Sequence, residues 1–219
     1  MTPRRYTSDS RVEQARLTRR RILEHADQLF RAGGYLGTTL ADVARASGVS
    51  VQTVYNLVGG KDIVLKAVYD IAVAGDDDPV SMADRPLVRA MVAADSAETA
   101  LAFYARMARE INERVLSLVI VVLAQAAAGD PQLAEFAATI EHERGLGTAA
   151  TARQIAARFT LRSGLDRAKA ADVLWTLTAP DIADRLVHHR GWSWNRYERW
   201  LAQTITDALV GPTGGPRAS

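Results

Sequence analysis

The sequence predicts an all-α protein, with an N-terminal three-helix helix-turn-helix domain, a linking helix and a larger C-terminal helical domain. Three observations support this prediction. Apolar residues recur three or four positions apart through most of the 219 residues. Capping residues and glycine pairs divide that pattern into helix-sized pieces. The one stretch with the composition of a strand, residues 119–122, has no second strand with which to pair.

The first predicted helix opens at a capping box, because Ser10 is followed three positions later by Glu13. Apolar side chains recur at helical spacing as far as Phe30, and Gly33-Gly34 supplies a stop. The N-terminus is rich in arginine, since residues 1–21 carry seven basic and two acidic side chains. We interpret its beginning either as a solvated, disordered tail or as an arm attracted to phosphate groups.

Two short helices with a tight turn between them follow. The first opens at Thr39, which Asp42 can cap reciprocally, and the second opens at Ser50 and ends at Gly59-Gly60. The turn Ser47-Gly48-Val49 supplies the glycine and the apolar residue that a helix-turn-helix crossing needs.

A fourth helix begins at Lys61 and ends before Gly75–Pro79, whose glycine, aspartates and proline mark a domain boundary. The predicted parts are a helix-turn-helix domain with a basic arm at 1–60, a linking helix at 61–75, a helical domain at 76–211 and a disordered tail at 212–219. Within the third part we expect helices at 86–128, 131–160, 166–190 and 194–210.

The second helix of the pair has an unusual composition. It carries no charged side chain between Ser50 and Gly60, although a solvent-facing helix normally carries lysine, glutamate and arginine. Its outward positions instead carry amide, hydroxyl and methyl groups, at Val51, Gln52, Thr53, Tyr55 and Asn56. Glutamine and asparagine can pair with adenine, and methyl groups can contact thymine. The pattern favours a helix that reads base edges in DNA, while its spacing alone also fits an ordinary helical hairpin.

Glycines, caps and core residues agree with one known pattern over residues 16–66. They are Thr18-Arg19-Arg20-Arg21-Ile22-Leu23, Ala26, Leu29-Phe30, Gly34-Tyr35, Thr38-Thr39-Leu40, Asp42-Val43-Ala44, Ser47-Gly48-Val49-Ser50, Gln52-Thr53-Val54-Tyr55, Lys61-Asp62 and Leu65. This segment resembles the DNA-binding domain of the tetracycline-repressor-like (TetR) regulators. More weakly, Trp175, residues 186–192, Tyr197 and Trp200-Leu201 resemble the closing helices of one subgroup.

The resemblance implies base reading by Val51, Gln52 and Asn56, and contact with bases or phosphate by Tyr55. It implies backbone contacts by Thr39, Thr53 and Lys61. The chain departs from the family at Leu57-Val58, where many members have His-Phe, and at Gly60, where they have Ser or Asn, so the fourth helix is less well capped. The predicted DNA-binding residues are Thr39, Ser50, Val51, Gln52, Thr53, Tyr55, Asn56 and Lys61.

The resemblance also implies a small-molecule pocket in the C-terminal domain, and its apolar composition suggests a hydrophobic effector. The candidate lining residues are Met91, Phe103, Tyr104, Met107, Leu118 and Leu123, which fit plain core packing equally well. One helix-turn-helix covers too little DNA for specific binding, so we expect a homodimer. Its predicted interface is Leu174, Trp175, Leu186, Trp194, Tyr197, Trp200, Leu201, Ile205 and Leu209.

Rival sites are weaker. Residues 145–150 match a loose dinucleotide-binding fingerprint, but no strand precedes them, so a loosened or broken helix is the better interpretation. The clusters Glu141/His142/Glu143 and Asp184/His188/His189 lack a tetrahedral spacing and fit solvated faces better than metal sites. We expect no metal, no cofactor and no catalytic residue.

The expected function is therefore a sequence-specific DNA-binding regulator, most simply a repressor that a small ligand releases from its operator. A regulator that binds DNA without an effector is the alternative, and a helical enzyme or adaptor is more remote. The chain has no cysteine, and its longest apolar run, residues 115–124, is too short to span a bilayer. We expect a cytoplasmic location without membrane contact.

Overall fold

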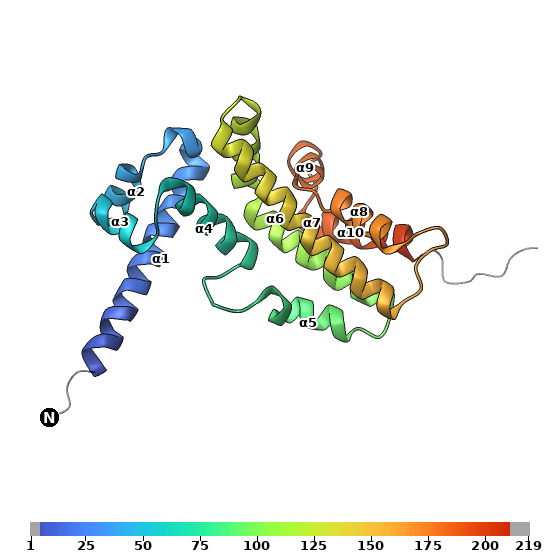
Figure 1. Cartoon of the computed structure of the whole chain (residues 1–219). Helices are drawn as coiled ribbons and strands as arrows, with labels where there is room; N and C mark the ends of the chain where they lie inside the picture. The colour runs from blue at the N-terminus through green and yellow to red at the C-terminus, as the bar shows by residue number, and fades with distance from the viewer. Residues whose placement is uncertain (1–4, 211–219) are drawn as a thin grey trace, which may run out of the picture. The chain divides into compact units, whose positions relative to one another are not determined.

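The computed structural model describes residues 5–210, with side chains from Ser10 onward, and every regular element among them is helical. Figure 1 labels the helices, and the predicted all-α class is confirmed. In chain order they are α1 (Arg5–Gly37), α2 (Leu40–Ser47), α3 (Val51–Leu57), α4 (Lys61–Ala74), the 3-10 turn η1 (Met82–Asp84), α5 (Pro86–Ala93), α6 (Ala97–Ala127), α7 (Pro131–Arg158), α8 (Arg167–Leu177), α9 (Pro180–Asp184), the π-helical turn η2 (Arg185–His189) and α10 (Trp194–Leu209). The predicted tail at 212–219 lies outside the described residues.

The chain divides into two compact units. The first holds the residues up to Asp77 together with 117–136, and the second holds 78–116 and the residues from 137 onward. Two of the divisions fall inside α6 and α7, so each of these helices belongs partly to both units. The predicted limits placed 117–136 wholly in the C-terminal domain. Their grouping with the N-terminal helices depends on tertiary contacts that a linear pattern does not reveal.

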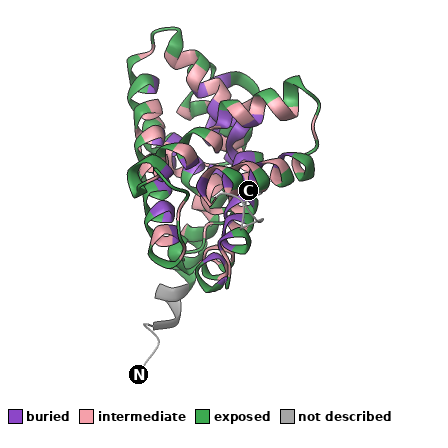
Figure 2. Ribbon diagram, turned by 90° about the vertical axis from the view of Figure 1, so that its right-hand side faces the viewer, coloured by how far each residue is buried: buried purple, intermediate pink, exposed green. Residues whose placement is uncertain are grey.

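In the first unit, one apolar face of α1 packs against α2, α3 and α4. Ile22 and Phe30 of α1, Val43 of α2, Val54 of α3 and Leu65 of α4 are each at most 2% exposed. Burying a side chain of this size stabilises a fold by ~1.5–3 kcal/mol. Figure 2 shows buried positions recurring along one side of the helices, as the apolar spacing predicts.

The first helix is longer than the sequence predicted. It begins at Arg5, so Ser10 and Glu13 lie within its first turns and the predicted capping box is wrong. Neither glycine nor proline stands between Arg5 and Ser10, so the sequence contains nothing that would stop the helix from extending. At the predicted stop the backbone does break, at Gly34 (φ 73, ψ 166), and a further short stretch leads to Gly37.

The side chain of Gln125, near the end of α6, packs against this break. Its Oε1 accepts a hydrogen bond from the backbone N–H of Leu36 at 3.3 Å. A Cβ atom on Gly34 would lie 2.5 Å from Gln125 Nε2. Arg31 of α1 also donates a hydrogen bond to Ser117 Oγ of α6. These contacts attach the end of α6 to α1 inside the first unit.

The core of the second unit contains a buried polar cluster. Asn112 Nδ2 donates hydrogen bonds to the carbonyl oxygen of Thr178 at 3.2 Å and to Tyr197 Oη at 3.3 Å. Burial raises the pKa of both Tyr104 and Tyr197 to about 12, so both hydroxyl groups stay protonated at neutral pH. Because a buried amide without partners is costly, this cluster fixes how α6, the end of α8 and α10 meet.

Two predictions about helix continuity are wrong. Helix α7 runs unbroken through Gly145 and Gly147, which have no positive φ, and the loosened or broken helix predicted there does not occur. The long helices predicted at 86–128 and 166–190 are each divided. Ser96 accepts a hydrogen bond from the N–H of Thr99 and caps α6, and Pro180 opens α9. No helix within residues 5–210 is both long and apolar enough to cross a membrane.

The break in α1 makes a stability prediction. We expect Gly34→Ala to lower the free energy of unfolding by ~1–3 kcal/mol, because the φ and ψ of Gly34 lie in a region that essentially only glycine occupies. Gly37→Ala is the matched control, since a Cβ there meets nothing within 4 Å and its φ is not positive. Urea unfolding followed by circular dichroism measures both, and equal stability of the two variants would contradict the prediction.

Candidate nucleic-acid interface

The helix-turn-helix is built on two capped ends. Thr39 Oγ1 accepts a hydrogen bond from the N–H of Asp42 at 3.1 Å, and the Asp42 carboxylate accepts one from the N–H of Thr39 at 3.0 Å. This is the predicted reciprocal capping box at the start of α2. Helix α2 ends at Gly48, whose left-handed backbone (φ 64, ψ 36) lets its N–H reach the carbonyl oxygens of Ala44 and Arg45.

Helix α3 starts directly after this turn and is capped as predicted. Ser50 Oγ accepts a hydrogen bond from the N–H of Thr53 at 3.0 Å and lies 2.8 Å from Thr53 Oγ1. Val54 is fully buried and holds α3 against the rest of the unit. Because residues two positions away on a helix point to the far side, the burial of Val54 turns Gln52 and Asn56 outward.

The outward face of α3 is exposed and uncharged. Val51 is 38% exposed and Tyr55 is 52% exposed, and Gln52 and Asn56 are also exposed. Gln52 Nε2 donates a hydrogen bond to Asn56 Oδ1 at 2.9 Å, so the two amide groups stand side by side on this face. Amide pairs and methyl groups are the chemistry that distinguishes base edges in the major groove.

Lys61, a predicted backbone contact, lies at the start of α4 but points into its own unit. Its Nζ lies 4.0 Å from the centre of the Tyr35 ring, a cation–π contact. Burial lowers the pKa of Lys61, and the Asp130 carboxylate partly opposes that shift. Gly60 provides no side-chain cap for α4, as the sequence predicted. The ammonium group of Lys61 is therefore held against Tyr35 in the free protein.

Comparison with known proteins agrees with this geometry. Residues 22–68 match the model of the bacterial regulatory proteins of the tetR family. Residues 22–68 therefore form a TetR-family N-terminal domain. No curated protein matches the sequence at a significant level.

Several solved structures share the fold at low sequence identity. A putative TetR-family transcriptional regulator from Rhodococcus sp. is 18% identical, with 88% of this chain and 98% of that chain covered and a TM-score of 0.66. A SmeT–triclosan complex is 19% identical, with coverage of 92% and 100% and a TM-score of 0.67. A putative transcriptional regulator from Saccharomonospora viridis in complex with choline is 20% identical, with coverage of 88% and 97% and a TM-score of 0.63.

The residues predicted to line a TetR-type effector pocket fall in different units. Met91, Phe103, Tyr104 and Met107 belong to the second unit, whereas Leu118 and Leu123 belong to the first. Met91, Tyr104 and Leu118 are buried, and the other three are partly exposed. Their role as a pocket stays a prediction.

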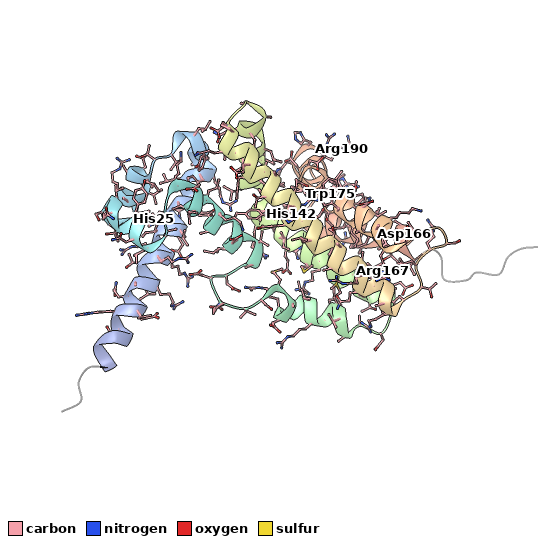
Figure 3. The ribbon with its side chains drawn as sticks, in the orientation of Figure 1. His25, His142, Asp166, Arg167, Trp175 and Arg190 are labelled. Atoms are coloured by element: carbon pink, nitrogen blue, oxygen red, sulfur yellow. The ribbon has the colours of Figure 1, made fainter. Side chains whose placement is uncertain are left out.

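The predicted dimer-interface residues also separate into two groups. Five are buried within the second unit of a single chain, namely Leu174, Tyr197, Leu201, Ile205 and Leu209. Trp175 on α8, which is labelled in Figure 3, is 39% exposed. Leu186, Trp194 and Trp200 are partly exposed. The second group is the part of the prediction that a partner chain can still contact.

The acidic and histidine clusters make local contacts. His188 Nδ1 and His189 Nε2 lie 2.8 and 3.1 Å from the two oxygens of Asp184, and Glu141 pairs with Arg144 at 2.6 Å. Sequence reasoning missed the contacts of Tyr35 with Lys61 and of Gln125 with α1. The pair Gly34-Tyr35 was part of the TetR resemblance, but nothing in the linear sequence shows which side chains approach it.

The geometry of α3 predicts a division of roles. We expect Gln52→Ala or Asn56→Ala to relax discrimination at one base pair by ~1–3 kcal/mol, because each removes one bidentate contact. Lys61→Ala should weaken binding to all sequences alike and reduce the salt slope by about one. Binding titrations against single-base variants of a selected site measure these effects. If Gln52→Ala weakened every site equally, α3 would not read bases.

Proposed function

We propose that this TetR-family protein is a sequence-specific transcriptional repressor that binds operator DNA as a homodimer and leaves it when a small molecule binds. The observation that carries the proposal is the exposed, uncharged face of α3, held by two capped helix ends in the segment that matches the family. No catalytic role is part of the proposal. The protein acts where it meets the genome, in the cytoplasm.

The reading face supports a defined set of contacts. The paired amides of Gln52 and Asn56 match the donor and acceptor pattern of adenine in the major groove. The exposed methyl groups of Val51 suit thymine, and Tyr55 can contact a base or a phosphate. Thr39, Ser50 and Thr53 lie at the starts of α2 and α3, where backbone N–H groups favour phosphate.

The small size of one helix-turn-helix favours a homodimer. One helix-turn-helix contacts too few base pairs for specific binding, so such modules pair on a two-fold axis. We place the interface on α8 and α10, where Trp175, Trp194 and Trp200 keep exposed aromatic surface of the kind enriched at interfaces. The buried residues Leu174, Tyr197, Leu201, Ile205 and Leu209 support that surface from beneath.

Selection of bound duplexes from a random pool tests this function. We expect a palindrome of two half-sites, because the two-fold symmetry of the dimer is copied in the DNA, with centres ~34–36 Å or a multiple of that apart. Light scattering of the free protein at micromolar concentration should give the mass of two chains. A single unrepeated half-site with a monomeric mass would contradict the homodimer, and no enrichment of any sequence would contradict specific DNA binding.

Helix α4 supports control by a ligand. Within the first unit, the ring of Tyr69 on α4 meets the ring of Phe136 on α7 edge-on, with 5.7 Å between the ring centres. The charge of Asp130, just before α7, acts to raise the pKa of Lys61 on α4. Helices α6 and α7 continue from this unit into the second one. A ligand that changes their arrangement in the second unit would shift the segment against which α4 packs. The recognition helices of a dimer would then lose the spacing that DNA requires.

A small hydrophobic effector is the proposed ligand class. SmeT was solved with triclosan, and the Saccharomonospora viridis protein was solved with choline, so related folds accommodate small molecules. We propose Met91, Phe103, Tyr104, Met107, Leu118 and Leu123 as candidate contacts for the effector. The alternative is a regulator that binds DNA constitutively and whose core is filled by these same side chains.

A panel of hydrophobic small molecules separates the two. We expect the compounds that raise the melting temperature to weaken operator binding by about 5–150-fold, because a coupling of ~1–3 kcal/mol is typical and acts reciprocally on both ligands. Thermal unfolding and DNA titration with and without each compound provide the measurement. Stabilising compounds that leave operator affinity unchanged would contradict ligand-controlled release and favour the constitutive alternative.

A further inference from the structure

The charged side chains of α1 are segregated around the helix. The described acidic side chains of α1 are Glu13, Glu24 and Asp27, and each pairs with an arginine three or four positions away. The pairs are Glu13 with Arg16 at 3.0 Å, Glu24 with Arg20 at 2.9 Å and Asp27 with Arg31 at 2.7 Å. This side of the helix is therefore close to neutral.

A second face of α1 carries no acid. Arg11, Gln14, Thr18, Arg21 and His25 follow one another at intervals of three and four residues. At 3.6 residues per turn they span an arc of about 80°. We call these five residues the basic face of α1. The three described acids lie on other parts of the helix surface. The positive charges of Arg11 and Arg21 therefore have no acid beside them on this face.

The arginines of the basic face are free. Among residues 10–210, Arg11 and Arg21 are exposed and make no ion pair or side-chain hydrogen bond, whereas Arg19 pairs with Asp77 at 3.2 Å. An arginine that serves a structural role is normally paired, as Arg16, Arg19, Arg20 and Arg31 are here. Two unpaired guanidinium groups on an acid-free face form a surface that matches a polyanion.

The basic face belongs to the same unit as the proposed DNA-reading surface of α3, so DNA is the polyanion considered. Figure 1 shows the early turns of α1 extending beyond α2, α3 and α4, and Figure 3 labels His25, at the other end of the basic face. Helix α1 also contacts α3, which carries the proposed reading surface. Arg21 lies ten positions after Arg11, a distance of ~15 Å along the helix axis.

We propose that the basic face of α1 binds the phosphate backbone of the duplex outside the base pairs that α3 reads. The inference rests on the proposed DNA-binding function and extends it to the flanking DNA. A distance of ~15 Å corresponds to about four base-pair steps at 3.4 Å each, so Arg11 and Arg21 can contact separate phosphates. Because the face lies on a continuous helix anchored in the core, it holds the duplex in a fixed position that a flexible tail could not maintain.

The test compares two double variants that remove the same charge. Arg11→Gln/Arg21→Gln removes the free arginines, and Arg16→Gln/Arg20→Gln removes two paired arginines from the same helix. Each variant is titrated against the selected site in two lengths, one trimmed to the base pairs read and one extended by about ten base pairs on each side. Circular dichroism of both variants checks that α1 remains helical.

We expect Arg11→Gln/Arg21→Gln to lose affinity for the extended duplex by roughly tenfold or more at 0.1 M salt. Its salt slope should fall by about two per protomer, because each phosphate contact releases about one counterion when it forms and two such contacts are lost. Base preferences should not change, and the loss on the trimmed duplex should be much smaller. The Arg16→Gln/Arg20→Gln control should show a smaller loss that is the same for both duplexes.

Two outcomes would overturn the inference while leaving the proposed function intact. Equal losses for the two double variants would mean that net charge alone matters. Unchanged affinity of Arg11→Gln/Arg21→Gln for the extended duplex would mean that the face serves another partner, such as an acidic protein. If the wild-type protein binds neither duplex, the proposed function itself fails and the inference falls with it.

Discussion

The candidate interface depends on how the turn at Gly48 joins α2 to α3. Its left-handed backbone allows one N–H to satisfy the carbonyl groups that end α2, and it sets the direction in which α3 leaves. Val54 is then buried, and its burial fixes which side of α3 faces outward. Gln52 and Asn56 are exposed because the opposite side of this seven-residue helix packs against the core. The chemistry of the face therefore follows from a packing constraint beneath it.

Helix α1 supports several parts of the first unit at once. One face carries Ile22 and Phe30 into the core that holds α2, α3 and α4. Near its break at Gly34, the helix binds the side chain of Gln125 from α6. Its Arg31 donates a hydrogen bond to Ser117, also on α6. A third face presents Arg11 and Arg21 without partners. Changes near the end of α6 and contacts made by the basic face therefore bear on the same helix.

Lys61 illustrates how tertiary contacts modify the role of a predicted site residue. Its position at the start of α4 suits a phosphate contact, but its ammonium group rests on the ring of Tyr35. The lowered pKa of Lys61 reflects that burial. Exchange of Tyr35 for a phosphate would couple DNA binding to the packing of α1 and of the α7 start, where Asp130 lies.

The sequence alone determined the helical class, the capped ends at Thr39 and Ser50, the turn at Gly48 and the composition of α3, because these depend on neighbours within a few positions. It also indicated the interruption of α1 at Gly34. Only the tertiary structure decided that residues 117–136 group with the N-terminal helices, that Lys61 meets Tyr35, and which interface candidates are already buried by their own chain. Those facts depend on contacts between segments that are far apart in the chain, and apolar spacing shows that a face is buried without showing what covers it.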